Sequence, residues 1–393
     1  MAADGPSPLL KKGDAVDWWF VFKFNGAAFP GCAGDANRVC PFGGEILNHR
    51  VSGQQYVYAS SENEKLQKGS DCAGDTVADP IGATFDEIYN GSLHYVVWND
   101  QFYDDPIIQG CNRECRSPWG HSKGIVAWND AGDGLVMQVT TPSWPGAGNA
   151  SFPRQRDGNT LGCVHDNNVQ FSQHFFALRL TKEDLVKVLE ALRNASVVTD
   201  PTNPQIVSNG GPTDVQELVA ILGTKSGSTR PTKDRLSSGV QLISKPSRLH
   251  VPPWQLVSAE LDGVSLRAAT WWAAPRIYTT TATTEITCWD STLHEPGPVQ
   301  IATSGEWADT KFGLTGGYPG SNFNHAKIGV STPGSVAYVI FGDLNQQGAI
   351  SQKCSSSQNG RGGLFYVLTN SQLFEGVNAL IAGDTAPTSV PAH

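Results

Sequence analysis

The stretch WGHSKGIVAWNDAGDGLVMQVTT, residues 119–141, contains two apolar runs separated by a glycine turn. The first run, Ile125–Trp128, is rich in β-branched and aromatic residues, and the second begins after Gly134, so both are typical of β-strands. Side chains two residues apart in a strand point to the same face. The stretch therefore predicts two consecutive strands, with the imidazole of His121 and the ammonium group of Lys123 projecting together.

The same pattern recurs 204 residues later in the chain. His325 and Lys327 are again two residues apart and are followed by a strand-like run, a Pro-Gly turn and a second run that ends in GDLN, with Asn345 as its last residue. The first copy ends in TTPS, with Ser143 in the corresponding place. Two copies with the same layout indicate a duplicated unit, and we expect the equivalent strand ends to meet at one site.

The letters GHSKG, residues 120–124, also fit the G-x-S-x-G pattern of serine hydrolases. That motif requires a strand before the serine and a helix directly after it. Here Pro118 interrupts the preceding segment, and the residues that follow predict a strand. Ser122 is therefore interpreted as a spectator rather than a nucleophile.

Composition places the chain among folded proteins that are rich in strands and loops. Of its 393 residues 39% are hydrophobic and only 17% are charged, and it contains 42 glycines and 24 prolines. No apolar run reaches the length of about 18 residues that a membrane span needs, and the first residues lack the apolar region of a signal peptide. The net charge of −9 argues against a passive nucleic-acid-binding module, but protonation of nine histidines would cancel it in acid.

Helices and strands are predicted in both halves of the chain. Thr181 and Asp184 form a capping box at the start of a helix over 184–195, Pro252 and Pro253 start a helix over 254–262, and Thr213 caps a third over 214–222. Strands are expected at 17–24, 93–100, 124–129, 134–141, 285–290, 327–331, 336–343 and 363–368. The Pro- and Gly-rich segment 199–214 predicts a boundary between units 1–204 and 205–393. The fold class is mixed α/β, with sheets covered by helices.

The cysteines and the carboxylates give no metal-binding pattern. The eight cysteines contain no C-x-x-C pair, Cys111 and Cys115 have no second ligand pair, and no H-E-x-x-H occurs. An even number of cysteines favours disulfides and an oxidising compartment, with buried free thiols as the alternative. We therefore expect chemistry without a metal or another cofactor.

Taken together, these segments resemble the deoxyribonuclease II family of the phospholipase D superfamily. The resemblance rests on VDWWFVFKF, TFDEIYNGSLHYVVWNDQ, WGHSKG, PPWQLVSAELDGVSLRAATWW, SNFNHAKIGVS and GDLNQ followed by RGGLFYV. It implies a pseudo-dimer of two helix-covered halves that share one active site. It also implies that His121 and His325 are catalytic, that Lys123 and Lys327 bind phosphate, and that Asn345 and Ser143 add polar contacts.

The chain departs from the superfamily pattern in one respect. The pattern H-x-K-x4-D would place aspartates where Trp128 and Thr332 stand, so the group that orients each imidazole is unidentified, and Asp130 is the available substitute after a bulge. The resemblance also suggests a disulfide between Cys288 and Cys354. The remaining six cysteines allow fifteen pairings.

What the resemblance implies is a metal-independent acid endonuclease. It would cleave double-stranded and also single-stranded DNA and leave 3′-phosphate and 5′-hydroxyl ends, with His121 as the nucleophile that forms a phosphohistidine and His325 as the acid and base. No membrane contact is expected, a homodimer stays open, and the expected location is secreted, periplasmic or lysosomal. The alternatives are a phosphodiesterase acting on lipid headgroups and an inactive binding protein of the same fold.

Overall fold

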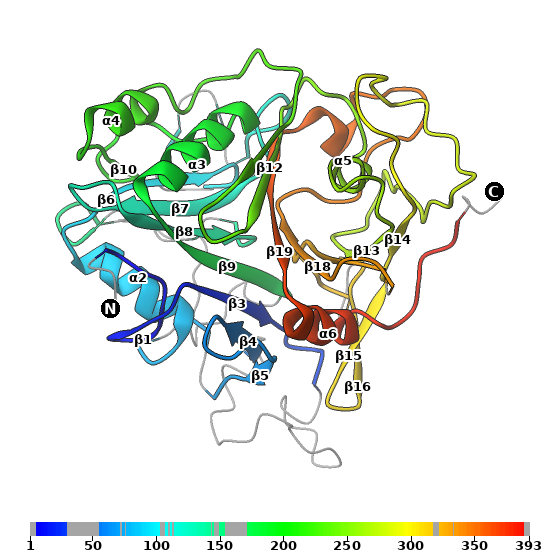
Figure 1. The fold of residues 1–393 in the computed structure, drawn as a ribbon, viewed down its shortest axis with the longest axis horizontal. Helices are drawn as coiled ribbons and strands as arrows, with labels where there is room; N and C mark the ends of the chain where they lie inside the picture. Colours follow the sequence, from blue (N-terminus) through cyan, green and yellow to red (C-terminus); the bar gives the residue numbers. More distant parts are fainter. Residues whose placement is uncertain are drawn as a thin grey trace.

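Two large β-sheets form the framework of the protein (Figure 1). The computed structural model describes residues 5–29, 55–70, 73–74, 76–102, 107–108, 111, 114–142, 144, 149–153, 171–316, 322–332 and 334–388. Within these ranges the chain builds one sheet from strands up to residue 208 and the other from strands that begin at residue 232. The expected mixed α/β organisation in two helix-covered halves is thereby confirmed.

The first sheet has eight strands in the order β10-β6-β7-β8-β9-β3-β4-β5. Its bounds are β3 Trp18–Lys23, β4 Tyr56–Ser60, β5 Gln67–Lys68, β6 His94–Asn99, β7 Lys123–Trp128, β8 Gly134–Val139, β9 Gln173–Leu180 and β10 Val207–Ser208. All neighbouring strands in this sheet are antiparallel. The central strands β7, β8 and β9 are buried almost throughout, which explains their nearly continuous apolar sequence.

The second sheet has seven strands in the order β11-β12-β19-β18-β17-β13-β14. Its bounds are β11 Thr232–Arg235, β12 Gln241–Lys245, β13 Leu266–Ala269, β14 Val299–Ile301, β17 Ile328–Ser331, β18 Tyr338–Gly342 and β19 Gly363–Thr369. The pair β13 and β14 is parallel, so this sheet is mixed. Two small sheets, β1 Leu9–Lys11 with β2 Asp14–Ala15 and β15 Ser304–Trp307 with β16 Thr310–Gly313, lie beside the large ones.

Five helices and one short 3-10 turn cover the sheets in the described ranges. They are α2 Pro80–Asn90, α3 Lys182–Ala195, α4 Thr213–Ala220, α5 Pro253–Glu260, η1 Ser357–Gly360 and α6 Ser371–Leu380. Figure 1 shows α3 and α4 above the first sheet and α6 below the second. Helix α3 contacts β8 and β9 of its own sheet as well as β12 and β19 of the other, so it joins the two halves.

The order of elements repeats between the two sheets. The neighbours β6, β7, β8, β9 and β3 correspond to β13, β17, β18, β19 and β12, and helices α2 and α5 precede β6 and β13 while α3 and α6 follow β9 and β19. The register repeats too. Gly124 pairs with Gln138 and Ile328 pairs with Phe341, and these two pairs stand three residues after His121 and His325.

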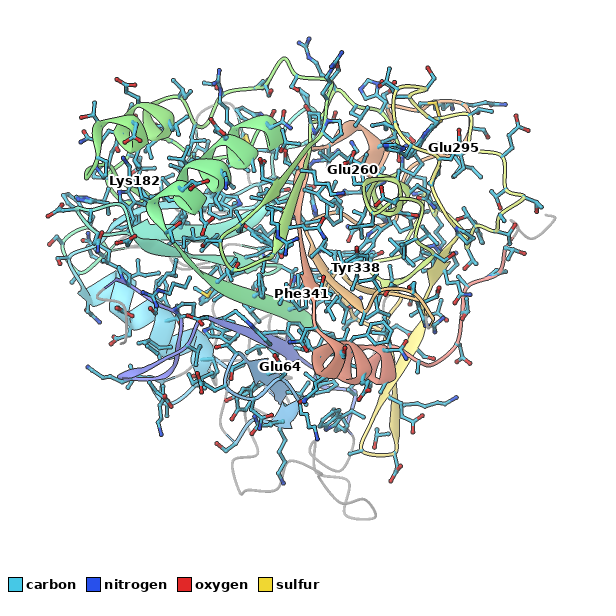
Figure 2. All side chains as sticks on the ribbon, viewed as in Figure 1. Glu64, Lys182, Glu260, Glu295, Tyr338 and Phe341 are labelled. Atoms are coloured by element: carbon cyan, nitrogen blue, oxygen red, sulfur yellow. A yellow bond between two sulfur atoms is a disulfide. The ribbon has the colours of Figure 1, made fainter. Side chains whose placement is uncertain are left out.

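Aromatic side chains fill the space between the sheets. The ring of Phe341 on β18 lies 4.5 Å from that of Phe20 on β3 and 4.7 Å from that of Phe176 on β9, measured between centroids. Phe176 also contacts Tyr366 on β19. Figure 2 shows Phe341 near the middle of the view, whereas Lys182 and Glu295 lie nearer its edges. Because the core is continuous between the sheets, the two halves are held in one fixed arrangement.

Most of the predicted helices and strands are confirmed, with two corrections. Thr181 and Asp184 form the capping box of α3, and α5 begins after Pro252. Thr213 is the first residue of α4 rather than its cap, which is Pro212 without a side-chain hydrogen bond. The strand expected at 285–290 is wrong. The backbone amide of Cys288 in that segment instead donates to Ile350 O, and its sulfur is bonded to Cys354.

The predicted division at residues 204/205 falls just before strand β10. That strand pairs with β6 at the edge of the first sheet. Helix α4, which follows β10, contacts α3. The first strand of the second sheet, β11, begins only at Thr232.

Candidate active site

A cavity of about 560 Å³ lies where the ends of β7 and β8 meet the ends of β17 and β18. Its walls include five of the six residues expected from the sequence, namely His121, Lys123, His325, Lys327 and Asn345. The sixth, Ser143, lies outside the described residues. Residues 204 positions apart in the chain therefore line one space.

The backbone places the two histidines by reciprocal contacts between the halves. The amide N–H of His121 donates to Gly362 O at 2.8 Å, and that of His325 donates to Ser172 O at 2.7 Å. Gly362 precedes β19 and Ser172 precedes β9. Each histidine is thus attached to the strand entry of the opposite sheet, which explains why the two imidazoles converge.

The ring of His121 is oriented by a backbone carbonyl. Its Nδ1 lies 3.0 Å from Asp343 O, so Nδ1 carries the proton and donates it. This leaves a lone pair on Nε2, the nitrogen that can act as a nucleophile. Burial and the nearby Lys123 ammonium hold the pKa of His121 well below its usual value, which keeps the ring neutral.

The ring of His325 has a different partner. Its Nδ1 lies 3.3 Å from Nε2 of Gln173, an amide donor, so Nδ1 accepts and the proton of the neutral ring is on Nε2. The ring packs against Phe171 and Trp271, with centroids 4.0 Å and 4.6 Å away, and the residue is only 7% exposed. Burial, followed by Lys327 and Lys123, holds the pKa of His325 well below its usual value.

Lys123 belongs to a buried ion-pair network. Its Nζ donates to Asp100 Oδ1 at 2.6 Å, and Arg361 from the second half donates to Asp100 Oδ2 at 2.8 Å. Burial by itself would raise the pKa of Asp100, but Lys123 and its neighbouring cations lower that pKa well below the usual range. Arg361 also donates to the carbonyls of Cys115, Trp119 and Gly120, and so fixes the segment that leads into His121.

The ammonium group of Lys327 has a backbone carbonyl as its hydrogen-bond partner, whereas that of Lys123 has the carboxylate of Asp100. Nζ of Lys327 donates to the carbonyl of His325 at 2.5 Å. Burial and the Lys123 ammonium lower the pKa of Lys327 to about 7. The lysine is therefore fully charged only in acid, where it attracts an anion most strongly.

Three polar atoms on the cavity wall are buried and have no hydrogen-bond partner among the residues that the structure describes: Nε2 of His325, Oδ1 of Asn345 and Nε1 of Trp271. An unsatisfied buried polar atom costs about 1–3 kcal/mol. A polar ligand in the cavity could form hydrogen bonds with these atoms and relieve that cost. The three atoms are therefore candidate ligand contacts.

Four residues of this network were not found from the sequence: Asp100, Gln173, Asp343 and Arg361. Asp100 and Asp343 are the last residues of the predicted strands 93–100 and 336–343 and directly follow β6 and β18 in the structure, and this position was the available signal. Arg361 is the first residue of the segment RGGLFYV on which the resemblance rests, whereas Gln173 had no signal in the sequence. The suggestion that Asp130 orients His121 is wrong, because Asp130 lies at the other end of β7 and contacts Nε2 of His94 at 2.8 Å.

Two buried carboxyl groups next to residues of the cavity wall, Asp100 and Asp343, have opposite pKa shifts. In contrast to Asp100, Asp343 has its pKa raised to about 7, because burial outweighs its hydrogen bonds. Its Oδ1 accepts from Gln138 Nε2 at 2.9 Å and its Oδ2 from Leu364 N at 2.8 Å. The Ser122 hydroxyl accepts a hydrogen bond from Trp98 Nε1 at 2.8 Å and is 2% exposed.

The four described cysteines form two disulfides. Cys288 is bonded to Cys354, as the resemblance suggested, and Cys111 is bonded to Cys115. Cys32, Cys40, Cys72 and Cys163 lie outside the described residues. Over the described ranges no group of three or more His, Cys, Asp or Glu side chains has the arrangement of a metal site.

Imidazole and ammonium groups from both halves surround one cavity. Such groups can transfer protons and stabilise the negative charge on a phosphoryl group, as in a phosphodiester hydrolase. The chain belongs to the deoxyribonuclease II family, whose model "Deoxyribonuclease II" matches residues 7–383. "Cell-death-related nuclease 7" of Caenorhabditis elegans is 22% identical over 371 residues, which cover 93% of this chain and 83% of that protein. "Putative deoxyribonuclease-2" of Burkholderia thailandensis is 26% identical over 150 residues, or 37% of this chain and 36% of that protein.

The protein is thus a deoxyribonuclease II-like endonuclease. Among the helices that the structure describes, none has the length and apolarity required to cross a bilayer.

Proposed function

We propose that the protein hydrolyses DNA phosphodiesters in acid, without a metal, through a covalent phosphohistidine, and that it leaves 3′-phosphate and 5′-hydroxyl ends. The observation that carries this proposal is the difference between the two Nδ1 partners. The carbonyl of Asp343 leaves a lone pair on Nε2 of His121, whereas the amide of Gln173 leaves a proton on Nε2 of His325. One ring is thus prepared to attack and the other to donate.

In the first step Nε2 of His121 attacks phosphorus, and the bond between phosphorus and the 5′-oxygen breaks. His325, protonated on both nitrogens, transfers its Nε2 proton to the departing 5′-oxygen. A positioned acid of this kind contributes about 10²–10⁴-fold. The products are a free 5′-hydroxyl end and a DNA 3′-phosphoryl group bonded to His121.

In the second step a water molecule attacks the phosphorus of the phosphohistidine. Nε2 of His325, now neutral, takes a proton from that water while the bond between phosphorus and His121 breaks. The 3′-phosphate is released, His121 regains its lone pair, and His325 is again protonated. Every proton and bond is thus restored at the end of a turnover.

The cations of the cavity are proposed to stabilise the additional negative charge on phosphorus. An ammonium group about 4 Å from a phosphoryl oxygen is worth on the order of 4 kcal/mol at an effective dielectric constant near 20. Lys327 is the stronger candidate for direct contact, since Lys123 is already bonded to Asp100. Asn345 is proposed as a neutral phosphate ligand, and Ser143 as its counterpart in the first half.

The acid optimum follows from the environment of the imidazoles. Burial and neighbouring lysines hold the pKa values of His121 and His325 well below their usual range, so protonation of His325 requires a low pH. The net charge of −9 repels DNA at neutral pH, and histidine protonation relaxes that repulsion.

Several further features belong to the same proposal. Double- and single-stranded DNA are both substrates, because the proposed groups act on the phosphodiester and not on base pairs. One chain supplies every acting group, so activity does not depend on a homodimer. The two disulfides support an oxidising location, either secreted, periplasmic or lysosomal. The duplicated halves are proposed as a pseudo-dimer, with units 1–204 and 205–393.

The test is digestion of plasmid DNA from pH 4 to pH 8 with EDTA, followed by analysis of the product ends. We expect an acidic optimum, full activity with the chelator, 3′-phosphate ends and a steep decrease with salt. Dependence on Mg²⁺, or 5′-phosphate ends, would refute the proposal.

A further inference from the structure

Gln173 links three groups at the boundary between the halves. Its Nε2 lies 3.3 Å from Nδ1 of His325, and its Oε1 accepts a hydrogen bond from Thr140 Oγ1 at 2.6 Å. Thr140 Oγ1 in turn accepts from the backbone amide of His174 at 3.0 Å, which leaves its own proton free for Gln173. Gln173 is fully buried, so the orientation of its amide is determined by protein contacts.

The corresponding position in the second half is a glycine. Gln173 pairs with Lys23 on β3, and Gly363 pairs with Lys245 on β12 in the same register. A Cβ atom on Gly363 would lie 2.7 Å from Leu344 Cγ, so no side chain fits there. His121 is therefore oriented by the Asp343 carbonyl, and only His325 has a side chain as its Nδ1 partner.

Within the described residues, the groups whose charge lowers the pKa of His325 are the cations Lys327, Lys123 and Lys23, together with the imidazole of His121 when that ring is protonated. On β9, His174 contacts the backbone of Lys327 and has its own pKa held low by burial and Lys327. A carboxylate that would favour the imidazolium is thus replaced at Nδ1 by the neutral amide of Gln173.

We propose that Gln173 is the positioning residue for His325. We also propose that its side-chain amide rotates by 180° when Nδ1 of His325 takes up the proton that makes this histidine a general acid. This inference rests on the proposed function. In the observed orientation the amide donor faces Nδ1 and stabilises the neutral ring. After a rotation of 180° Oε1 faces Nδ1 and accepts the new Nδ1–H. Nε2 keeps its proton in both states, and that proton faces the substrate.

Thr140 can serve both orientations of the amide. It donates to Gln173 Oε1 in the observed one, and its oxygen can accept from Nε2 after the rotation. Its proton then has an alternative acceptor in His174 O, which lies 3.2 Å away. The contacts of Gln173 with Thr140 and with Nδ1 of His325 can thus both be made in either orientation, which limits the cost of the rotation.

The first test is Gln173→Glu, which places a carboxylate at Nδ1 and should stabilise the imidazolium. We expect the alkaline limb of the pH profile of kcat, which reports protonated His325, to move upward by at least one pH unit. The acidic limb, which reports neutral His121, should move much less. Gln101→Glu is the matched control, since it adds the same charge to the same cavity wall from the segment after β6, whereas Gln173 on β9 is the Nδ1 partner of His325. Its alkaline limb should shift by less than half as much.

The second test is Gln173→Leu with two substrates. DNA cleavage should fall by about 10–100-fold, since the acid is no longer positioned. The first-turnover release of nitrophenolate from bis(p-nitrophenyl) phosphate should stay within about 3-fold of wild type, because that leaving group departs without a proton. A merely structural role for Gln173 would lower both rates together.

The outcomes separate the two claims. A wild-type enzyme without metal-free acid nuclease activity would contradict the proposed function. An active Gln173→Glu variant whose alkaline limb coincides with that of wild type would overturn the positioning role alone. So would an equal loss of both rates in a folded Gln173→Leu variant.

Discussion

The two halves of the molecule share a backbone arrangement but differ in the side chains that surround the cavity. Lys23 and Lys245 are fully buried at the ends of β3 and β12, where each donates to a carbonyl just before the neighbouring strand: Phe171 O at 2.5 Å and Arg361 O at 3.0 Å. The backbone contacts of His121 and His325 also match. These repeated contacts build the same scaffold twice.

The side chains that contact the reactive groups do not repeat. Asp100 lies two residues after Trp98, which pairs with Gly124 on β7. Trp271 lies two residues after Ala269, which pairs with Ile328 on β17, so Trp271 occupies the corresponding position in the second half. One lysine therefore has a carboxylate partner, while the other half has an indole packed on His325. A phosphodiester has an attacking side and a leaving side, and the proposed function assigns His121 to the first and His325 to the second.

The largest effect is expected from removing each histidine in turn. His121→Ala should lower DNA cleavage by more than about 10⁴-fold and abolish the phosphoenzyme, because the nucleophile is lost. His325→Ala should lower it by about 10²–10⁴-fold and still place phosphate on His121. Peptide mapping after a rapid quench at pH 5 identifies the modified residue. Phosphate on His325 in the wild-type enzyme would reverse the division of roles.

The next effect concerns Asp100, which has no counterpart in the second half. Asp100→Ala should lower the free energy of unfolding at pH 7 by about 3–5 kcal/mol, because Lys123 and Arg361 lose a buried partner. Its folded pKa lies below its unfolded pKa, so this contribution is complete above pH 5 and disappears as the pH falls below 4. Urea denaturation measures both. Asp17→Ala, at an exposed ion pair with Arg179, should cost less than about 1 kcal/mol.

The two described disulfides, one in each half, should differ in how much they contribute to the free energy of unfolding. Loss of Cys288–Cys354, which are 66 residues apart, should cost about 4 kcal/mol. Loss of Cys111–Cys115, only 4 residues apart, should cost about 2 kcal/mol. Paired Cys→Ser variants in thermal unfolding give the values. Equal costs would mean that loop closure in the unfolded chain is not the main contribution.

Asp343 should give the opposite pH dependence to Asp100. Its pKa is raised to about 7, so between pH 4 and pH 7 the folded protein binds a proton that the unfolded chain releases. The stability from this group is complete below pH 4 and is lost as the pH rises through 7. Asp343→Asn should remove about 3 kcal/mol of that difference between pH 5 and pH 7, at about 1.4 kcal/mol per unit. An unchanged slope in urea denaturation would contradict it.

The smallest effect compares the caps of the corresponding helices α3 and α6. Thr181 caps α3 in a capping box, and Asn370 caps α6 through Leu373 N at 2.9 Å. Thr181→Ala and Asn370→Ala should each cost about 1 kcal/mol, since each leaves a helix N–H without its acceptor. Thermal unfolding at pH 7 checks both. A cost above 3 kcal/mol for either would show a role beyond capping.

Local patterns predicted the elements that present the site. The strands that carry both His-x-Lys segments follow from β-branched residues between turn signals, and α3 follows from its capping box and apolar spacing. Helices α2 and α6 and several strands, among them β4, β9, β12 and β13, were missed. Helix α2 has a start signal in Asp79 and Pro80 that was overlooked, whereas β9 is buried on both faces, so its sequence lacks a strict alternation.

The sequence by itself predicted an imidazole and an ammonium group at the front of a strand in each half, and the structure begins β7 at Lys123 and β17 at Ile328, directly after Lys327. Only the tertiary structure decided how those imidazoles differ. The partner of His121 lies 222 residues away and that of His325 lies 152 residues away. One of these partners is a backbone carbonyl, which every residue type possesses, so no sequence pattern could have identified it.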